Sequence, residues 1–228
     1  MGLFWKVVWA CLGLAMVGFP GAGAASNKAG LSAMERGLLD QMAKEGTNTM
    51  RLYALADLCH DAGAGGDKEA VVRAEGYLRQ LLSSEPDNAQ GLGLLGSVYT
   101  MKGRDSFWPT TQLKLVREGI EMMDKAVKLA PEDLRTRMTR VFNNAHMPDF
   151  LGRGETVIAD LEWLWGKVEK EPQLFTVRQR QELALHWGKR LKRLDRVSEA
   201  RKVLEAGRDF EAQSPMARQI AAELAKIR

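Results

Sequence analysis

Residues 92–131 have the sequence LGLLGSVYTMKGRDSFWPTTQLKLVREGIEMMDKAVKLAP, with small and apolar residues at regular spacings: Leu92-x-x-Leu95-Gly96-x-x-Tyr99, then Gly103, Gly119-x-x-x-Met123, Ala126 and Pro131. Steps of three and four residues place these side chains on one side of each of two helices. Gly96 lets the helices approach closely, and Leu95 and Tyr99 fill the seam between them. Pro131 ends the second helix, because proline has no backbone N–H to donate. The stretch therefore predicts a helix hairpin, one unit of a helical repeat.

Weaker versions of this pattern stand on both sides of it. Leu52-x-x-Leu55-Ala56-x-x-Cys59 precedes it, and Ala184-x-x-Trp187-Gly188-x-x-Leu191 follows it. We expect repeat units at about 48–86, 89–131, 134–172 and 181–213, within one domain that spans 32–228. No segment alternates convincingly with a period of two, so the predicted fold class is all-α.

Single helices are expected at the two ends of the array. Ser32, with Glu35 in a capping box, begins a leading helix, and Gly46 ends it in the left-handed conformation that glycine favours. Ser214 and Pro215 begin a capping helix, 214–228, whose polar residues Arg218, Glu223 and Lys226 would face solvent.

The second and third units depart from regular spacing. Gly119 follows Gly96 by 23 residues, whereas the repeat needs about twelve, so roughly eleven residues from Arg104 to Lys114 form an insertion between the helices. A second insertion, 147–153, separates the helices of the third unit. The first helix of that unit admits two registers. Counting from Pro131 places Arg137 and Arg140 in the seam. The apolar residues Met138, Val141, Phe142 and Ala145 instead favour a shift of one residue. We expect the shifted register, because the apolar side of a helix is the side that is buried.

Residues 52–207 together resemble tetratricopeptide repeat (TPR) proteins, whose pattern is W-x-x-L-G-x-x-Y, then A-x-x-x-F, then P. Phrases such as Leu95-Gly96-Ser97-Val98-Tyr99 and Lys125-Ala126-Val127-Lys128-Leu129-Ala130-Pro131 are also similar to uncharacterised exported bacterial proteins of this family. The resemblance implies a right-handed superhelical solenoid of TPR-like hairpins with capping helices and long inter-helix insertions. It also implies a non-enzymatic scaffold that binds a protein or peptide on the concave face, which the first helix of each hairpin mainly forms.

Carried onto this chain, the resemblance implies a set of inner-face residues that bind the partner. They are Tyr53, Asp57, His60, Gln90, Gly93, Ser97, Thr100, Thr139, Asn143, Leu185, Lys189 and Lys192. No pair of Lys and Asn stands in the carboxylate-clamp arrangement known from chaperone-tail binders. A partner held by its terminal carboxylate is therefore not expected.

Two features lie outside the repeat pattern. Phe107 and Trp108, in the first insertion, are either an anchor for a partner or a cover for the helix seam. Several arginines either gather into an anion-binding cluster through their bidentate guanidinium groups, or are neutralised by Asp105, Glu155 or Asp160. These arginines are Arg104, Arg135, Arg137, Arg140 and Arg153. A cluster would suit an alternative function, a solute-transport accessory component that binds a small anion.

The first 25 residues have the pattern of a signal peptide: Lys6, an uncharged stretch from Val7 to Phe19, and an A-x-A site at Ala22-Gly23-Ala24. They predict export, to the periplasm, with cleavage. The alternative is an uncleaved membrane anchor, because the charge-free run Val7–Ala25 has 19 residues and about 20 span a bilayer. Cys11 lies in this segment, so cleavage leaves Cys59, which is expected to pack as a small hydrophobe.

Charge and motifs argue against several other classes. A formal net charge of +4 over 228 residues gives no support to nucleic-acid binding. The basic run 189–196 is typical of a solvated helix face, although peripheral membrane contact stays open. His60, His146 and His186 lie in different units without the spacing of metal ligands, and no nucleophile stands in a catalytic motif. We therefore expect no catalytic residue, no metal and no cofactor.

Overall fold

The computed structural model describes residues 24–227, with side chains from Ala33 onward. Its helices are α2 (Ala24–Glu45), α3 (Thr49–Ala64), α4 (Lys68–Ser84), α5 (Ala89–Asp105), α6 (Pro109–Leu129), α7 (Leu134–Asn144), α8 (Gly154–Lys170), α9 (Val177–Arg193), α10 (Val197–Asp209) and α11 (Pro215–Leu224). Short 3-10 helices, η1 (Asp149–Leu151) and η2 (Pro172–Leu174), flank α8. The described chain contains no strand, so it is all-α as predicted. The predicted signal segment, with Cys11, lies outside the described residues except for its last two.

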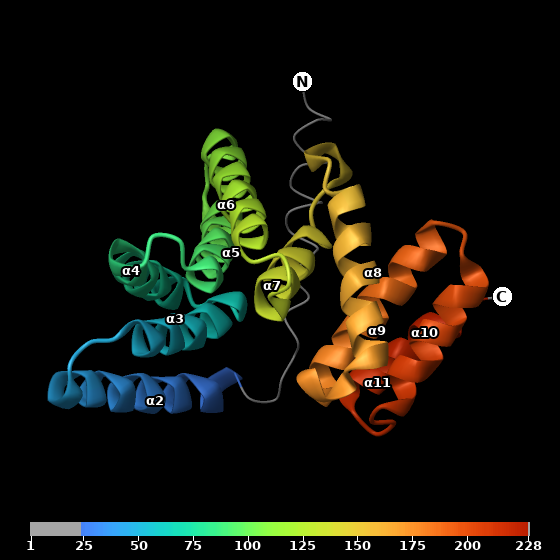
Figure 1. Ribbon diagram of the computed structural model, residues 1–228, viewed down its shortest axis with the longest axis horizontal. Helices are drawn as coiled ribbons and strands as arrows, with labels where there is room; N and C mark the ends of the chain where they lie inside the picture. Colours follow the sequence, from blue (N-terminus) through green and yellow to red (C-terminus); the bar gives the residue numbers. More distant parts are fainter. Residues whose placement is uncertain (1–23, 228) are drawn as a thin grey trace. The chain divides into compact units, whose positions relative to one another are not determined.

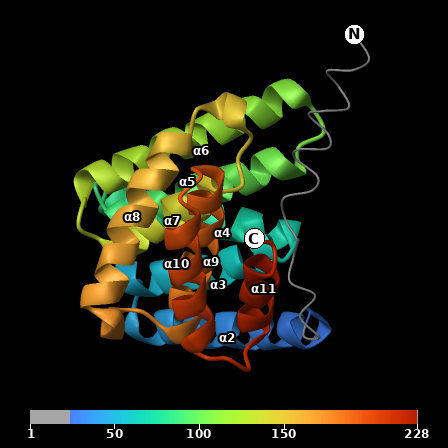
Figure 2. The ribbon, with the colours of Figure 1, turned by 90° about the vertical axis from the view of Figure 1, so that its right-hand side faces the viewer.

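The chain folds into two compact units, one ending at Pro148 and the other beginning at Asp149. Unit 1 contains α2–α7 (Figure 1), and unit 2 contains α8–α11. In unit 2, α9 and α10 form a hairpin against which α11 packs (Figure 2). The division between the units falls between α7 and α8, the two helices that the sequence pairs in its third repeat.

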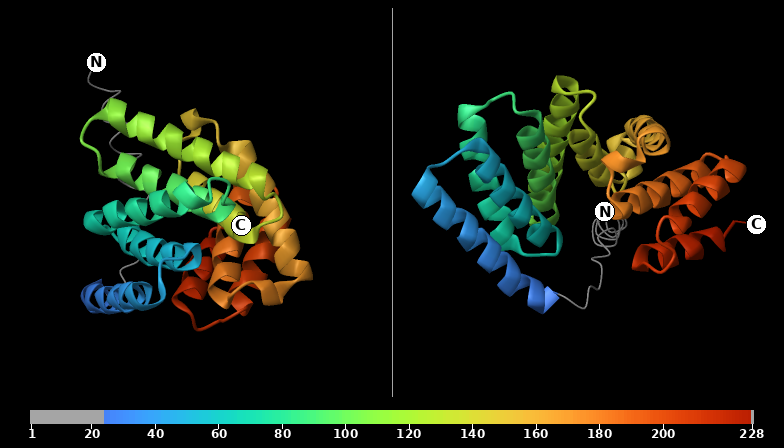
Figure 3. Two further views of the ribbon diagram at one scale, coloured as in Figure 1. Left: turned by 60° about the vertical axis from the view of Figure 1, so that its left-hand side comes forward. Right: turned by 60° about the horizontal axis from the view of Figure 1, so that its bottom comes forward.

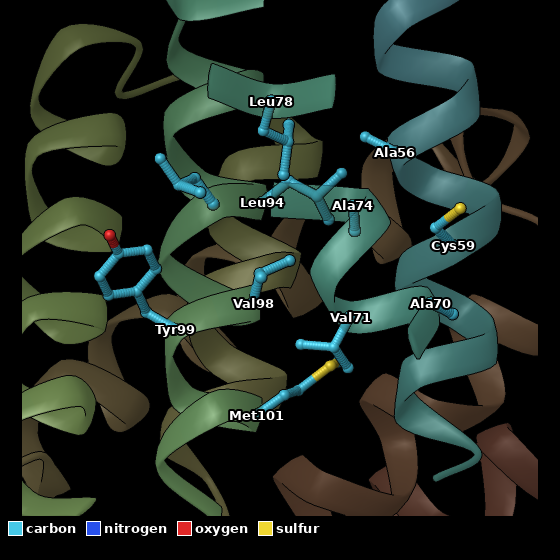
Figure 4. Packing of buried hydrophobic residues seen from close by; sticks show 11 residues of the cluster. Ala56, Cys59, Ala70, Val71, Ala74, Leu78, Leu94, Val98, Tyr99 and Met101 are labelled. Carbon is cyan, nitrogen blue, oxygen red and sulfur yellow. The ribbon is translucent and has the colours of Figure 1, made fainter. Parts of the chain in front are cut away.

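The core of unit 1 lies where α3, α4 and α5 meet (Figure 4). Ala70 and Ala74 are fully buried and allow the helices to approach, while Leu78 and Val98 fill the space between them. Cys59 is buried in the same cluster, as predicted for a small hydrophobe. The apolar faces that the periodicity predicts on these helices thus pack together into one continuous core.

Helices α5 and α6 lie side by side along their length (Figure 3). A Cβ on Gly96 would stand 2.5 Å from the carbonyl oxygen of Gly119, so the two backbones touch there, as the sequence predicts. A second close approach joins Gly103 to α6, because a Cβ on Gly103 would lie 2.9 Å from Val116 Cγ2. The helices therefore remain in contact beyond the length of an ordinary repeat.

The first insertion is mostly helical, so it does not separate the two helices from Arg104 to Lys114 as predicted. Helix α5 continues to Asp105 and α6 begins at Pro109, which leaves only residues 106–108 outside the helices. The extra residues lengthen both helices because Gly103 keeps their backbones close and Pro109 suits the first position of a helix.

The leading helix begins earlier than predicted. Helix α2 begins at Ala24, not at Ser32, so the predicted capping box does not lie at a helix end. Gly46 has a φ of +84° and ends the helix as expected. Alanines at positions 24, 25 and 29 favour helix, which explains why helical structure extends past the local capping signal.

Glu35 holds α2 against the first hairpin instead of capping its own helix. Its carboxylate accepts hydrogen bonds from Arg73 Nε at 2.9 Å and from the Tyr77 hydroxyl at 3.1 Å. The Cys59 thiol lies 3.5 Å from the same oxygen. Burial, together with the charge of Glu35, raises the pKa of Cys59 to about 11. One carboxylate thus links α2 to both α3 and α4.

Helix α7 shows that the predicted apolar register is only partly right. Its fully buried residues are Thr136, Val141 and Asn144. The other apolar residues of that register, Met138, Phe142 and Ala145, are half-buried. Thr136 fits opposite Gly93 on α5, where a Cβ would lie 3.9 Å from its methyl group. The room that Gly93 leaves explains why a polar but small residue takes a seam position.

Candidate functional site

The first helix of each hairpin, like the closing helix, begins at a side-chain cap. The caps of α3, α5, α7, α9 and α11 are Asn48, Asn88, Asp133, Thr176 and Ser214. Each accepts a hydrogen bond from a backbone N–H of the first turn, which fixes where the helix begins and how its side chains are phased. By contrast, α6, α8 and α10 have no side-chain cap. Local sequence therefore positions the helices that carry the predicted inner-face residues.

Tyr53, Asp57 and Arg135 form a cluster between α3 and α7. Arg135 Nη1 donates to Asp57 Oδ2 at 3.2 Å and lies 3.4 Å from the Tyr53 hydroxyl. The guanidinium stands 5.4 Å from the centre of the Tyr53 ring. Burial raises the pKa of Tyr53, although the hydrogen bond and charge of Arg135 oppose this effect. The side chains of Arg135 and Asp57 stay 49% and 41% exposed, so the cluster is ordered and accessible.

A second cluster joins α3, α5 and α7 through Ser97. His60 Nε2 lies 2.7 Å from Ser97 Oγ, and Asn143 Nδ2 donates to the same oxygen at 2.8 Å. Thr100 Oγ1 donates to Asn143 Oδ1 at 2.6 Å. Ser97 is 0% exposed, so the prediction that it contacts a partner directly is wrong. It is buried because three helices converge on it, and it links the partly buried side chains of His60 and Asn143.

The remaining inner-face residues of unit 1 extend these clusters. Gln90 Nε2 donates to Asp133 Oδ2 at 2.8 Å, which links α5 to the cap of α7. The carbonyl oxygen of Thr139 accepts from Asn143 at 3.3 Å. Gly93 is buried against Ala126, so its predicted place on the surface is wrong. We call the polar surface of α3, α5 and α7 the unit 1 face: Tyr53, Asp57, His60, Gln90, Thr100, Arg135, Thr139 and Asn143.

The predicted residues of α9 fall into two groups. Lys189 is exposed, and Lys192 Nζ forms an ion pair with Glu223 Oε2 of α11 at 3.3 Å. Leu185 is buried, so the prediction that it is accessible is wrong, because α9 is packed against α8, α10 and α11. Glu223, expected on the solvent face of the capping helix, points instead toward the lysines of α9. No spacing pattern in the sequence predicts this ion pair between α9 and α11.

The arginines have separate partners inside the protein. Arg104 forms a bidentate pair with Asp105 at 2.8 and 2.9 Å and also donates to the Gly63 carbonyl. Arg140 pairs with Asp124 at 3.0 Å. Arg137 Nε donates to the Pro131 carbonyl at 2.6 Å. Arg153 lies in unit 2, directly before α8. Within unit 1, these interactions neutralise or anchor each guanidinium individually.

Comparisons with known proteins bear on the fold. No protein-family model matches the sequence, and no curated protein matches it either. Among solved structures, the crystal structure of a thermophilic TPR protein from Thermus thermophilus is similar, with a TM-score of 0.63 over 86% of this chain and 90% of that chain. The two sequences are 15% identical. The chain has the tetratricopeptide-repeat fold. The predicted TPR resemblance is thereby confirmed for the fold, whereas its exported bacterial character stays a prediction.

In this chain, the polar residues that the repeat pattern indicated on α3, α5 and α7 do lie together. The pattern did not indicate Arg135 on this surface, because it lies one turn before the expected positions on α7.

The tip of the α5–α6 hairpin carries two aromatic rings. Phe107 and Trp108 are 80% and 67% exposed and meet edge to face, with ring centres 5.3 Å apart. The interpretation of these rings as a cover for the helix seam is therefore wrong, because the extended helices close the seam themselves. The aromatic tip remains a candidate anchor for a partner.

No group of three or more His, Cys, Asp and Glu side chains in residues 24–227 is arranged to hold a metal ion. No helix of that same range is long and apolar enough to cross a bilayer.

Proposed function

We propose that this protein is a non-enzymatic scaffold that binds an extended segment of a protein partner along the unit 1 face. The observation that carries the proposal is the Tyr53–Asp57–Arg135 cluster, which brings together residues 78 positions apart, from α3 and α7, and leaves them accessible. An extended peptide presents backbone donors and acceptors together with side chains. The unit 1 face offers a carboxylate, a guanidinium and an aromatic ring that can contact these groups.

Preorganisation supports this proposal. Interactions within the unit 1 face hold its side chains in place before a partner arrives, so less conformational entropy is lost on binding. Ser97 and Asn143 secure the middle of the face, and Arg135 and Asp57 secure one edge. A surface of solvated, independent side chains would lack this advantage.

A charge swap provides the test. The double variant Asp57→Arg with Arg135→Asp keeps opposite charges side by side but exchanges the donor and the acceptor on the unit 1 face. We expect the swap to retain the fold, measured by circular dichroism and melting temperature, and to lose the partner that wild type captures in cross-linking and mass spectrometry. The matched control swaps Arg196 and Glu199, an ion pair of 2.6 Å in unit 2. Equal capture by a folded Asp57/Arg135 swap would refute the proposal.

We also propose export to the cell envelope, supported by the signal-like pattern of residues 1–25. Mass spectrometry of the protein isolated from its own cells should find an N-terminus at Ala25, and fractionation should place it in the periplasm. A chain that retains Met1 and sediments with membranes would instead support the uncleaved anchor. The alternative function, small-anion binding by the arginines, stays a prediction, and we do not favour it because Arg104 and Arg140 pair with carboxylates.

A further inference from the structure

Unit 2 contains a basic pocket between α9 and α11, separate from the unit 1 face. It is lined by Lys189, Lys192, Arg193 and Glu223 and has a volume of about 460 Å³. A volume of this size lies within the range of natural ligand pockets. Every lining side chain is charged, so this open pocket can bind a charged group.

The charges in this pocket are unbalanced. Glu223 accepts from Lys192 at 3.3 Å and from Lys226 at 2.7 Å. Although burial favours its protonated form, these hydrogen bonds and the charge of Lys189 lower the pKa of Glu223. The carboxylate is therefore ionised at neutral pH and shared between two ammonium groups. Within residues 24–227, Lys189 and Arg193 have no ion pair of their own and remain exposed.

We propose that this pocket binds an acidic segment of the peptide partner, an inference that rests on the proposed scaffold function. A carboxylate of the partner lies between Lys189 and Arg193 and competes with Glu223 for Lys192. Glu223 thus acts as an internal counter-ion that occupies the pocket weakly and yields to a better-placed acid. Opposite charges across an interface mainly set specificity and the rate of association, and this pocket would select acidic sequences.

The same residues argue against a nucleic acid as the occupant. Single-stranded nucleic acid is bound by basic grooves that also supply aromatic side chains on which bases stack. No aromatic residue lines this pocket. Glu223 repels phosphates and carboxylates alike, but between the spaced acids of a peptide it can accept a hydrogen bond from a backbone N–H, which a nucleic-acid backbone lacks. A peptide with spaced carboxylates therefore fits better than a continuous polyanion.

The experiment uses the full chain and a fluorescent octapeptide of alternating Glu and Ser, acetylated and amidated so that no terminal carboxylate contributes. Fluorescence anisotropy at low salt should show binding that is lost when Gln replaces Glu. Lys189→Ala and Arg193→Ala should each weaken binding by about fivefold, because each removes a cation that faces the carboxylate. Lys202→Ala, an exposed cation of α10 outside the pocket, is the matched control and should change affinity by less than about twofold.

Glu223→Gln provides the sharpest test, because it should increase peptide affinity, whereas Lys189→Ala and Arg193→Ala should decrease it. Removing the internal carboxylate should tighten peptide binding by about two- to fivefold, since the competitor for Lys192 is lost. Weaker binding by a folded Glu223→Gln protein would refute the proposal. Equal affinity for the Gln peptide, or equal affinity for a single-stranded DNA oligonucleotide through the same lysines, would also refute it.

The outcomes also separate this inference from the proposed function. One outcome is that the Asp57/Arg135 swap abolishes partner capture while Lys189→Ala and Arg193→Ala leave peptide affinity unchanged. In that case the acidic-segment proposal is refuted and the proposal that the unit 1 face binds the partner is supported. If the acidic peptide binds through Lys189 and Arg193 while the swap has no effect on capture, binding at the unit 1 face is refuted and binding of an acidic segment in the pocket is supported.

Discussion

The backbones of Gly96 and Gly119 touch, so that a Cβ on either residue would collide with the carbonyl oxygen of the other. Glycine within a helix costs about 1 kcal/mol relative to alanine, because its unfolded backbone is freer. Glycine is nevertheless present in both helices, because the backbones of α5 and α6 contact each other at these two residues.

Gly96→Ala should therefore destabilise the protein, against the ordinary helix preference for alanine. We expect a loss of about 2–4 kcal/mol in the free energy of unfolding, measured by urea denaturation, because the helices must move apart. Gly76→Ala on α4 is the matched control, since a Cβ there meets nothing within 4 Å. It should stabilise the protein by about 0.5–1 kcal/mol. Destabilisation of similar size at both positions would contradict the packing argument.

The Cys59 thiol should make stability depend on pH in alkaline solution. Its pKa is raised from 9.0 to about 11 in the folded protein, first by burial and then by Glu35. The unfolded chain loses this proton at lower pH, so the contribution is present below pH 9 and is lost as pH rises toward 11. The loss amounts to roughly 2 kcal/mol.

Comparison with Cys59→Ala isolates the Cys59 contribution from that of Tyr77, which is present in both proteins. Urea denaturation at about pH 8 and about pH 10.5 should show a steeper decline for wild type. The native thiol should also react slowly with a thiol reagent at about pH 8. Parallel pH profiles for the two proteins would show that Glu35 and burial do not protect this thiol.

Ser97 should be a structural hub of the unit 1 face and not a contact for the partner. Ser97→Ala removes the nearer acceptor of Asn143 Nδ2, which keeps the Thr139 carbonyl at 3.3 Å, and removes the partner of His60 Nε2. We expect a loss of about 1–3 kcal/mol, the cost of unsatisfied polar groups that are partly removed from water. Thermal unfolding measures this loss, and an unchanged melting temperature would mean that water replaces the hydroxyl without cost.

Arg140 and Asp124 should be coupled, because they form an ion pair of 3.0 Å between α7 and α6. A double-mutant cycle with Arg140→Met and Asp124→Asn should give a coupling energy of about 1 kcal/mol in urea denaturation. Partner capture by the folded Arg140→Met protein should match that of wild type. Selective loss of binding without loss of stability would instead favour an anion-binding role for this arginine.

Phe107 and Trp108 should contribute little to folding. Replacing both by Ala, which adds no side-chain cap to α6, should change the free energy of unfolding by less than about 0.5 kcal/mol, because the rings are largely exposed. If the aromatic tip anchors a partner, the same variant loses that partner in the cross-linking assay. Substantial destabilisation would show that the rings support the hairpin after all.

Much of the helical framework was predictable because its signals are short-range. The steps of three and four residues around Leu95, the caps at Ser214 and Pro215, and the stop at Gly46 each act within a few residues. The all-α class and the hairpins of α3–α4 and α5–α6 follow from them. Capping and spacing signals were misleading where a helix could continue: α2 extends before Ser32, where alanines favour helix, and α5 extends past Gly103, where α6 packs closely against it.

The candidate sites depended on distances that no local pattern contains. Arg135 meets Asp57 across 78 residues, and Lys192 meets Glu223 across 31. Repeat periodicity indicates which side of a helix faces its neighbours. The TPR resemblance implied that His60 and Asn143 share an inner face, and in the structure both side chains contact Ser97. Which side chains then bond to each other, and which are buried like Ser97, depends on how far the helices approach and slide past one another. Those offsets are set by the volumes packed between them, and only the folded chain contains that information.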